Sequence, residues 1–180
     1  MFITIAGDLG SGKSSVGKIV AKKLNYEFLS VGGLMRELAQ EEGLSIVEFS
    51  KKAETDGGKI DELLDKKQQE LGKQKDKVIF DARLGWYFIP KSLKIYLKVD
   101  IDVSAQRIFN DARESEKENQ NIETTKQKIL ERKQSEKQRY KKYYGIDFDA
   151  PQHFDIIIDT TKKTIEEVAQ IIIDEVNKKE

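Results

Sequence analysis

The sequence predicts an α/β fold of three layers, in which a five-stranded, mostly parallel sheet is covered by helices on both faces. Five short runs rich in β-branched and aromatic residues alternate with longer segments of helical periodicity. Several of these runs are nearly continuous in apolar residues, which is typical of strands buried on both faces. At 180 residues the chain is long enough to bury its own core, and we expect a single domain over residues 1–180.

The expected strands follow from the five apolar runs. They cover residues 2–6, 26–29, 77–80, 93–99 and 154–158. The expected helices cover residues 12–24, 33–42, 45–54, 60–71, 123–144 and 165–176. Helical spacing is clear in the first and the last, where Val16 and Val20, and then Val168, Ile172 and Val176, recur on one face. Residues 114–121 include no large apolar side chain and so have little to bury, which predicts a mobile loop.

Composition excludes several kinds of site and partner. The sequence contains no cysteine, so disulfides, thiolate metal sites and cysteine nucleophiles are excluded. It carries 32 basic and 32 acidic residues, which gives no electrostatic case for a nucleic-acid partner. The first residues lack the features of a signal peptide, and no run reaches the ~18 apolar residues of a membrane span. We therefore expect a soluble, cytoplasmic protein that has no nucleic-acid or membrane partner. We also expect a monomer, although composition does not fix the oligomeric state.

A glycine-rich turn joins the first expected strand to the first helix and fits the phosphate-loop pattern of glycine, four residues, glycine, lysine and a hydroxyl residue. It consists of Gly7, Asp8, Leu9, Gly10, Ser11, Gly12, Lys13 and Ser14. Glycines let successive backbone N–H groups turn onto phosphate oxygens, and the following helix points its positive dipole end at the anion. The pattern therefore predicts a P-loop NTPase fold that binds ATP with Mg²⁺.

Each polar side chain of this turn has an expected role. Lys13 supplies charge to the β- and γ-phosphates, and Ser14 places a hydroxyl where Mg²⁺ is held. Ser15 either touches the α-phosphate or only begins the helix. Asp81 ends an apolar run, and ligands bind at the carboxyl ends of strands in such sheets. Asp81 is therefore the second candidate to hold Mg²⁺, its alternative role being that of a turn former.

Arginine is scarce in a chain that mostly uses lysine for surface charge, and its planar fork binds phosphate bidentately. The arginines are Arg36, Arg83, Arg107, Arg113, Arg132 and Arg139. All six are candidates for the anion site, and the alternative for each is a surface ion pair that contributes little. Arg132 and Arg139 are seven residues apart, so one face of a helix can aim both inward together with Ser135 and Glu136.

Two aromatic residues have weaker functional readings. His153 is the single histidine and is followed at once by a strand, so we expect a surface or packing residue rather than a catalytic base. Trp86 follows Arg83 closely and either walls a nucleotide base or packs in the core.

Four segments together resemble the archaeal-type cytidylate kinases over nearly the whole chain. They are the phosphate loop, SVGGLMRELA over residues 30–39, FDARLGW over residues 80–86, and SEKQRYKKYYGID over residues 135–147. The last segment, running into FDIIIDT over residues 154–160, is the most particular of them. The resemblance implies a nucleoside monophosphate kinase fold, with a five-stranded parallel core, an acceptor-binding insertion over about residues 31–75 and an arginine-bearing lid over about residues 112–123.

The resemblance also implies roles for individual residues. Arg36 and Arg83 would grip the acceptor's phosphate, and Ser30 and Asp61 match positions near the acceptor. The arginines that would close over the phosphates are Arg107, on the ATP side, Arg113, Arg132 and Arg139, the last also reaching the acceptor.

The predicted reaction is transfer of the γ-phosphoryl group of ATP to a small nucleotide, CMP or dCMP, which gives CDP or dCDP. A phosphate acceptor is already a nucleophile, so no histidine base is required. Candidates to read the cytosine edge are Asp61, Gln68, Ser135 and Glu136. One alternative is another P-loop kinase acting on AMP, shikimate or dephospho-coenzyme A. The other is a nucleotide-dependent switch protein, although the sequence has no Asn-Lys-x-Asp guanine reader.

Overall fold

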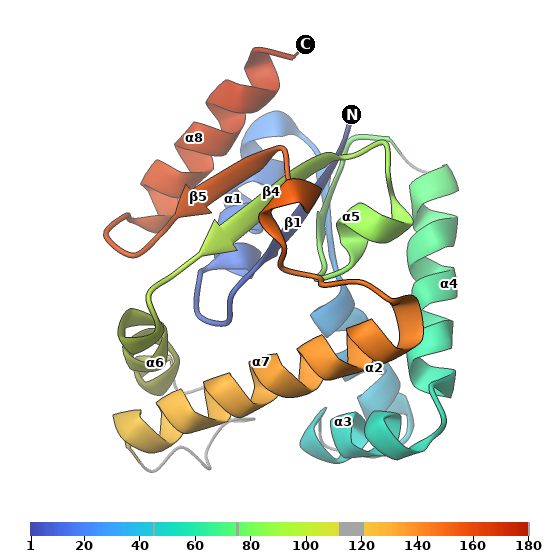
Figure 1. Ribbon diagram of the computed structural model, residues 1–180. Helices are drawn as coiled ribbons and strands as arrows, with labels where there is room; N and C mark the ends of the chain where they lie inside the picture. The colour runs from blue at the N-terminus through green and yellow to red at the C-terminus, as the bar shows by residue number, and fades with distance from the viewer. Residues whose placement is uncertain (45, 75, 112–120, 180) are drawn as a thin grey trace.

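The computed structural model describes residues 1–44, 46–74, 76–111 and 121–179 (Figure 1). Its centre is a sheet of five strands in the order β2-β3-β1-β4-β5. The strands are β1 (Phe2–Gly7), β2 (Glu27–Ser30), β3 (Val78–Asp81), β4 (Leu93–Lys98) and β5 (Ile156–Asp159). All four pairings between neighbours are parallel, which confirms the predicted five-stranded parallel sheet.

Helices cover both faces of this sheet, as the apolar strands predict. On one face α1 (Lys13–Leu24) packs against α8 (Ile165–Asn177), and both bury apolar side chains on the strands (Figure 1). Ile5, Ile95, Val20 and Ile172 are fully buried there. On the other face the short helix α5 (Gly85–Phe88) covers β1 and buries Trp86. The apolar layers fix the sheet rigidly and leave its carboxyl edge for polar residues.

The longest helix, α7 (Ile122–Tyr144), crosses beneath the ends toward which the strand arrows point in Figure 1. It packs against α6 (Ile101–Asn110) near its first turns. Asn121 caps α7, since its Oδ1 accepts a hydrogen bond from Thr124 N at 2.8 Å. The predicted lid over residues 112–123 coincides with residues 112–120, which lie outside the described residues, and with the start of α7. That lid stays a prediction.

Between β2 and β3 the chain forms α2 (Val31–Glu41), α3 (Ile46–Thr55) and α4 (Lys59–Gln74). These three helices share an apolar centre of their own, built from Ala39, Phe49, Ala53, Ile60 and Leu64. α4 also packs against α5, which anchors the three helices to the sheet. This is the segment that the resemblance implies as the acceptor-binding insertion.

Sequence analysis missed α5, α6 and the 3₁₀ turn Pro151–His153. A signal for α6 was present, because Asp100 is its N-cap and accepts hydrogen bonds from Asp102 N and Val103 N at 2.9 and 3.3 Å. α5 and the 3₁₀ turn span four and three residues, which is too short for a periodicity to show. Among the residues that the structure describes, no helix combines the length and apolar content that crossing a bilayer requires.

Candidate active site

The phosphate loop leaves β1 at the carboxyl edge of the sheet and turns sharply into α1. Gly10 and Gly12 have φ values of 69° and 86°, a region that favours glycine. A Cβ at Gly10 would lie 2.7 Å from Ser104 Oγ, and that hydroxyl donates a hydrogen bond to the Leu9 carbonyl oxygen at 2.7 Å. The tight approach to α6 therefore requires glycine, and the loop is fastened to that helix.

Lys13, Ser14 and Asp81 come together at this edge. Ser14 Oγ donates to Asp81 Oδ2 at 2.5 Å, because β3 lies next to β1 and ends beside the loop. Lys13 Nζ donates to the carbonyl oxygen of Asp8 at 2.6 Å. Desolvation, aided by the charge of Arg83, lowers the pKa of Lys13 to about 8, while Asp81 opposes the shift. The three side chains combine a cation with oxygen ligands, which suits a phosphate that carries a divalent ion.

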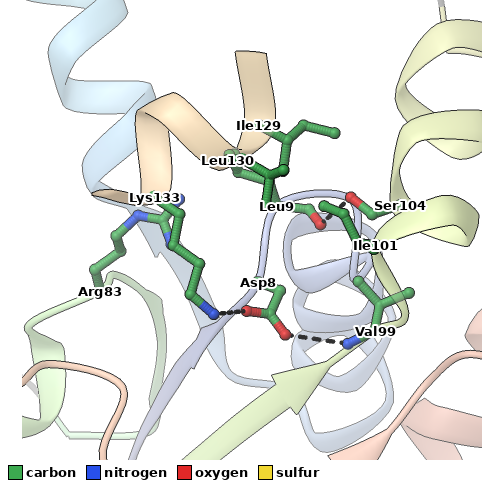
Figure 2. A pocket seen from close by; sticks show the side chains of 9 residues that line it. All are labelled: Asp8, Leu9, Arg83, Val99, Ile101, Ser104, Ile129, Leu130 and Lys133. Carbon is green, nitrogen blue, oxygen red and sulfur yellow. Dashed lines mark hydrogen bonds and ion pairs between the residues drawn. The ribbon is translucent and has the colours of Figure 1, made fainter. Parts of the chain in front are cut away.

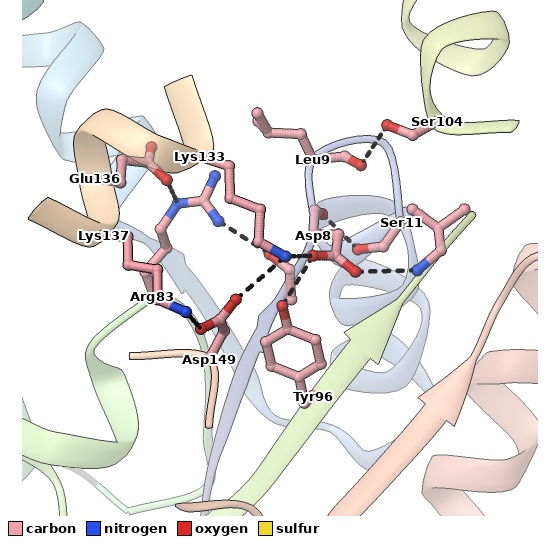
Figure 3. Close-up of polar contacts among 12 residues, drawn as sticks. Asp8, Leu9, Ser11, Arg83, Tyr96, Ser104, Lys133, Glu136, Lys137 and Asp149 are labelled. Atoms are coloured by element: carbon pink, nitrogen blue, oxygen red, sulfur yellow. Dashed lines mark hydrogen bonds and ion pairs between the residues drawn. The ribbon is translucent and has the colours of Figure 1, made fainter. Parts of the chain in front are cut away.

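The carboxylate of Asp8 links the loop to its surroundings. Its Oδ1 accepts from Tyr96 Oη and from Lys133 Nζ, each at 2.9 Å (Figure 3), and its Oδ2 accepts from Val99 N at 3.2 Å (Figure 2). Lys133 also pairs with Asp149 at 3.1 Å. Desolvation is the main cause that raises the pKa of Tyr96, and Asp8 adds to it. Lys133 therefore ties α7 to both the phosphate loop and the segment before β5.

A cavity of about 140 Å³ opens beside this network, between the phosphate loop, α6 and α7 (Figure 2). Its lining residues are Asp8, Leu9, Arg83, Val99, Ile101, Ser104, Ile129, Leu130 and Lys133. Most of these walls are apolar, with cationic groups at Arg83 and Lys133. The lining also includes the Asp8 carboxylate, which pairs with Lys133, so the cavity presents charges of both signs.

Arg83 lies between the loop and α7. Its Nε is 2.6 Å from Glu136 Oε2, and its Nη1 donates to the Gly7 carbonyl oxygen at 3.1 Å. Both side chains of this ion pair are largely buried. Desolvation opposes the charge of Arg83, yet Glu136 leads the attractions that raise its pKa overall. Arg132 Nε donates to the other oxygen of Glu136 at 3.1 Å. Glu136 therefore holds two of the predicted arginines.

The residues implied near the acceptor lie on the α2–α4 side. Arg139 Nε is 3.6 Å from Asp61 Oδ2, which joins α7 to the first turn of α4. Ser30 ends β2 and caps α2, where its Oγ accepts from Gly33 N at 2.9 Å. The side chain of Arg36 is exposed and folds back over Gly32 on the same helix. Its guanidinium is therefore accessible to a ligand.

A comparison with protein-family models matches residues 2–162 to the cytidylate kinase-like family. The chain belongs to this family. It is 35% identical to a cytidylate kinase of Methanobrevibacter smithii over 173 residues, which cover 96% of each chain. It is 36% identical to a cytidylate kinase of Methanocaldococcus jannaschii over 176 residues, covering 96% of this chain and 95% of that one. The resemblance read from the four sequence segments is therefore confirmed.

Solved structures agree on the fold of this cytidylate kinase-like chain. A shikimate kinase from Bacteroides thetaiotaomicron aligns with a TM-score of 0.68 at 19% identity, over 98% of each chain. An uncharacterized protein from Eubacterium ventriosum aligns with a TM-score of 0.70 at 15% identity. Identity this low shows a shared fold alone. The two structural alignments confirm the predicted three-layer P-loop architecture.

The remaining predicted arginines occupy different surroundings. Arg107 donates to the carbonyl oxygens of Gly10 at 3.3 Å and of Thr160 at 2.8 Å, so it bridges the phosphate loop and the turn after β5. Arg113 lies outside the described residues. On α7 Glu136 is buried and Arg139 partly buried, whereas Arg132 and Ser135 are exposed, although Arg132 still reaches Glu136. Ser15 is exposed on the first turn of α1.

Two expectations on aromatic residues are settled by packing. His153 stacks on Trp86 with ring centroids 4.1 Å apart, and Trp86 is buried among Tyr96 and Phe154. Both are packing residues, as predicted for His153. Sequence analysis missed Lys133, whose contact with Asp8 spans 125 residues. A single lysine in a lysine-rich helix gave no signal for this contact.

Proposed function

We propose that this chain is a cytidylate kinase, which transfers the γ-phosphoryl group of ATP to CMP or dCMP. The observation that carries the phosphotransferase reading is the contact of Ser14 with Asp81 beside Lys13 at the mouth of the phosphate loop. Cytidine as the acceptor is supported by the relatives, which are named cytidylate kinases over nearly the full length of the chain.

In this proposal Ser14 and Asp81 hold Mg²⁺ beside the phosphates. The donor set fits the ion, because hydroxyl and carboxylate oxygens are its preferred protein ligands and it keeps several waters and phosphate oxygens besides. When bound, Mg²⁺ neutralises charge on the β- and γ-phosphate oxygens. Ser14 Oγ and Asp81 Oδ2 lie 2.5 Å apart, so the two side chains are positioned to bind one ion.

The side chains around the loop would position the two phosphates for transfer. Lys13 and the backbone N–H groups of the loop bind the ATP phosphates, and Arg36 and Arg83 bind the acceptor phosphate. An oxygen of the acceptor phosphate forms a bond to the γ-phosphorus, while the bond to the β–γ bridging oxygen breaks and ADP leaves. Arg132 and Arg139 of α7, with Arg107, offset the charge of the transferring group. No general base is assigned.

Arg83 would exchange partners during this cycle. In the structure its guanidinium is paired with Glu136, which also binds Arg132. An incoming phosphate competes with that carboxylate for the same fork of donors. The acceptor phosphate would therefore loosen α7 from Arg83 as it binds. The predictions of a monomer and of a cytoplasmic location accompany this proposal.

An acceptor panel tests the proposal. ATP and Mg²⁺ are combined with CMP, dCMP, UMP, AMP, GMP, shikimate or dephospho-coenzyme A at equal concentrations, and kcat/KM is measured for each. We expect CMP or dCMP to give the highest value. A clear preference for AMP would leave the reaction class intact and overturn the cytidine assignment. Activity on shikimate alone would overturn the nucleotide acceptor altogether.

A further inference from the structure

Three buried polar atoms on α4 and α7 make no hydrogen bond, and two of them face each other as an ion pair. Among the described residues, the buried side-chain atoms without a hydrogen-bond partner include Asp61 Oδ2, Gln68 Oε1 and Arg139 Nε. Gln68 is 3% exposed, so water does not readily satisfy its amide oxygen. A buried acceptor that is left unpaired destabilises the folded protein, because it has given up its hydrogen bonds to water. Of these three atoms, Gln68 Oε1 has neither a hydrogen bond nor an ion-pair partner, which indicates a polar group that a ligand completes.

These atoms continue the polar row that begins at the phosphate loop. Arg83 reaches from Gly7 to Glu136, and Arg139 follows Glu136 by one turn of α7. Arg139 in turn lies 3.6 Å from Asp61 on α4. Asp61, Asp65 and Gln68 are spaced by four and three residues, so they share one face of α4. The row therefore connects the phosphate loop to the face of α4 that carries Gln68.

A hydrogen bond to Asp65 fixes the orientation of the Gln68 amide. Its Nε2 donates to Asp65 Oδ1 at 3.3 Å, and the hydroxyl of Tyr144 donates to the other oxygen of the same carboxylate. Desolvation raises the pKa of Asp65 to about 6, although Tyr144 opposes the shift, so the carboxylate remains mostly ionised at neutral pH. An ionised carboxylate only accepts hydrogen bonds. It therefore holds the amide N–H₂ group toward itself and leaves Gln68 Oε1 free to accept.

Resting on the proposed function, we infer that Gln68 Oε1 accepts a hydrogen bond from the 4-amino group of cytosine. Asp65 and Tyr144 are positioning residues that hold the Gln68 amide in this orientation. Uracil presents a carbonyl where cytosine presents the amino group, so it would face an acceptor with an acceptor. A site of this kind rejects the mismatched base because buried polar groups are left unpaired.

The test compares kcat/KM for CMP and UMP in variants that keep the volume of the site. Gln68→Met removes the acceptor without burying a new polar group, and Asp65→Asn lets the amide of Gln68 turn its N–H₂ group toward the base. In both we expect the CMP/UMP ratio to fall about 10- to 100-fold, through KM for CMP, while KM for ATP stays unchanged. Tyr144→Phe should produce a smaller fall in the same direction.

The matched control is Glu62→Gln on the exposed face of α4, where Glu62 pairs with Lys66. Like Asp65→Asn, this substitution removes one negative charge from α4. It should leave the CMP/UMP ratio of kcat/KM as in the wild type. Circular dichroism of each variant establishes that it is folded, and Tyr144→Phe carries the test if a variant on α4 is not. A wild type that prefers CMP, with variants that keep its ratio, would overturn this inference alone. A wild type that phosphorylates no cytidine nucleotide would overturn the proposed function and this inference with it.

Discussion

The phosphate loop and the wall formed by α4 and α7 lie at the same edge of the sheet, yet they are specified over very different distances along the chain. The loop consists of eight consecutive residues, from the last residue of β1 to the second residue of α1, and backbone conformation at Gly10 and Gly12 gives it its shape. The wall is assembled from contacts such as Asp65 with Tyr144, which are 79 residues apart. A ligand meets a backbone shaped by neighbouring residues at the loop and side chains brought together from distant parts of the chain at the wall.

This difference predicts where a single substitution has the greatest effect on turnover. Lys13→Ala removes one cation from a loop whose backbone remains in place, so the protein should stay folded while kcat falls about 100- to 1,000-fold. Turnover and circular dichroism are measured on the same preparation. Lys18→Ala, on the exposed part of α1, is the control that should retain activity. Near-normal turnover in folded Lys13→Ala would remove the phosphate-loop assignment.

Arg36 and Arg83, the two arginines proposed to bind the acceptor phosphate, differ in burial. Arg36→Ala and Arg83→Ala should each raise KM for CMP about 10- to 100-fold and leave KM for ATP nearly unchanged, because each removes a charge-assisted contact to the acceptor phosphate. Their stabilities should differ. Arg36 is exposed, whereas Arg83 is buried against Glu136, so its loss costs about 3 kcal/mol in the free energy of unfolding.

Urea unfolding of both variants measures the stability difference, and separate Michaelis constants measure the kinetic one. If KM for ATP rises in either variant and KM for CMP does not, the acceptor phosphate is bound elsewhere. Equal stability of the two variants would show that the pair of Arg83 with Glu136 does not support the fold.

The same contrast explains how far sequence analysis reached. The sheet, α1 and the phosphate loop were predictable because apolar runs and glycine spacing are local signals. Asp81 was predictable for the same reason, as the polar end of a buried strand. Glu136 was expected between two arginines, but its burial depends on Arg83, which approaches from another element. Lys133 and Asp65 had no local signal at all, since their roles arise only when α7 lies across the sheet.

A smaller effect on ATP binding is expected from Lys133, which joins α7 to Asp8 of the phosphate loop. Lys133→Met keeps the apolar stem beside Ile129 and Leu130 but breaks the pairs with Asp8 and Asp149. The side chain is 42% exposed, so the free energy of unfolding should fall by no more than about 1 kcal/mol. KM for ATP should rise a few-fold. Lys137→Met, which breaks pairs with Asp147 and Asp149 without touching Asp8, should leave KM for ATP unchanged. Equal values for both variants would contradict a role for the contact with Asp8.

The smallest effect concerns a proton at Lys13. Its pKa of about 8 in the free protein means that at pH 9 the side chain is mostly neutral. Bound phosphate stabilises the charged form and returns the pKa toward its ordinary value of about 10.4. Binding of ATP at pH 9 should therefore take up close to one proton, falling to a small fraction near pH 7. The sign is uptake, because the ligand raises the pKa of a basic group.

Calorimetric titration of the protein with ATP, without acceptor and in two buffers of different ionisation enthalpy, gives the number of protons taken up. Lys13→Arg stays charged throughout and should take up none. Equal binding heats for the wild type in both buffers at pH 9 would show that Lys13 is already charged before ATP arrives.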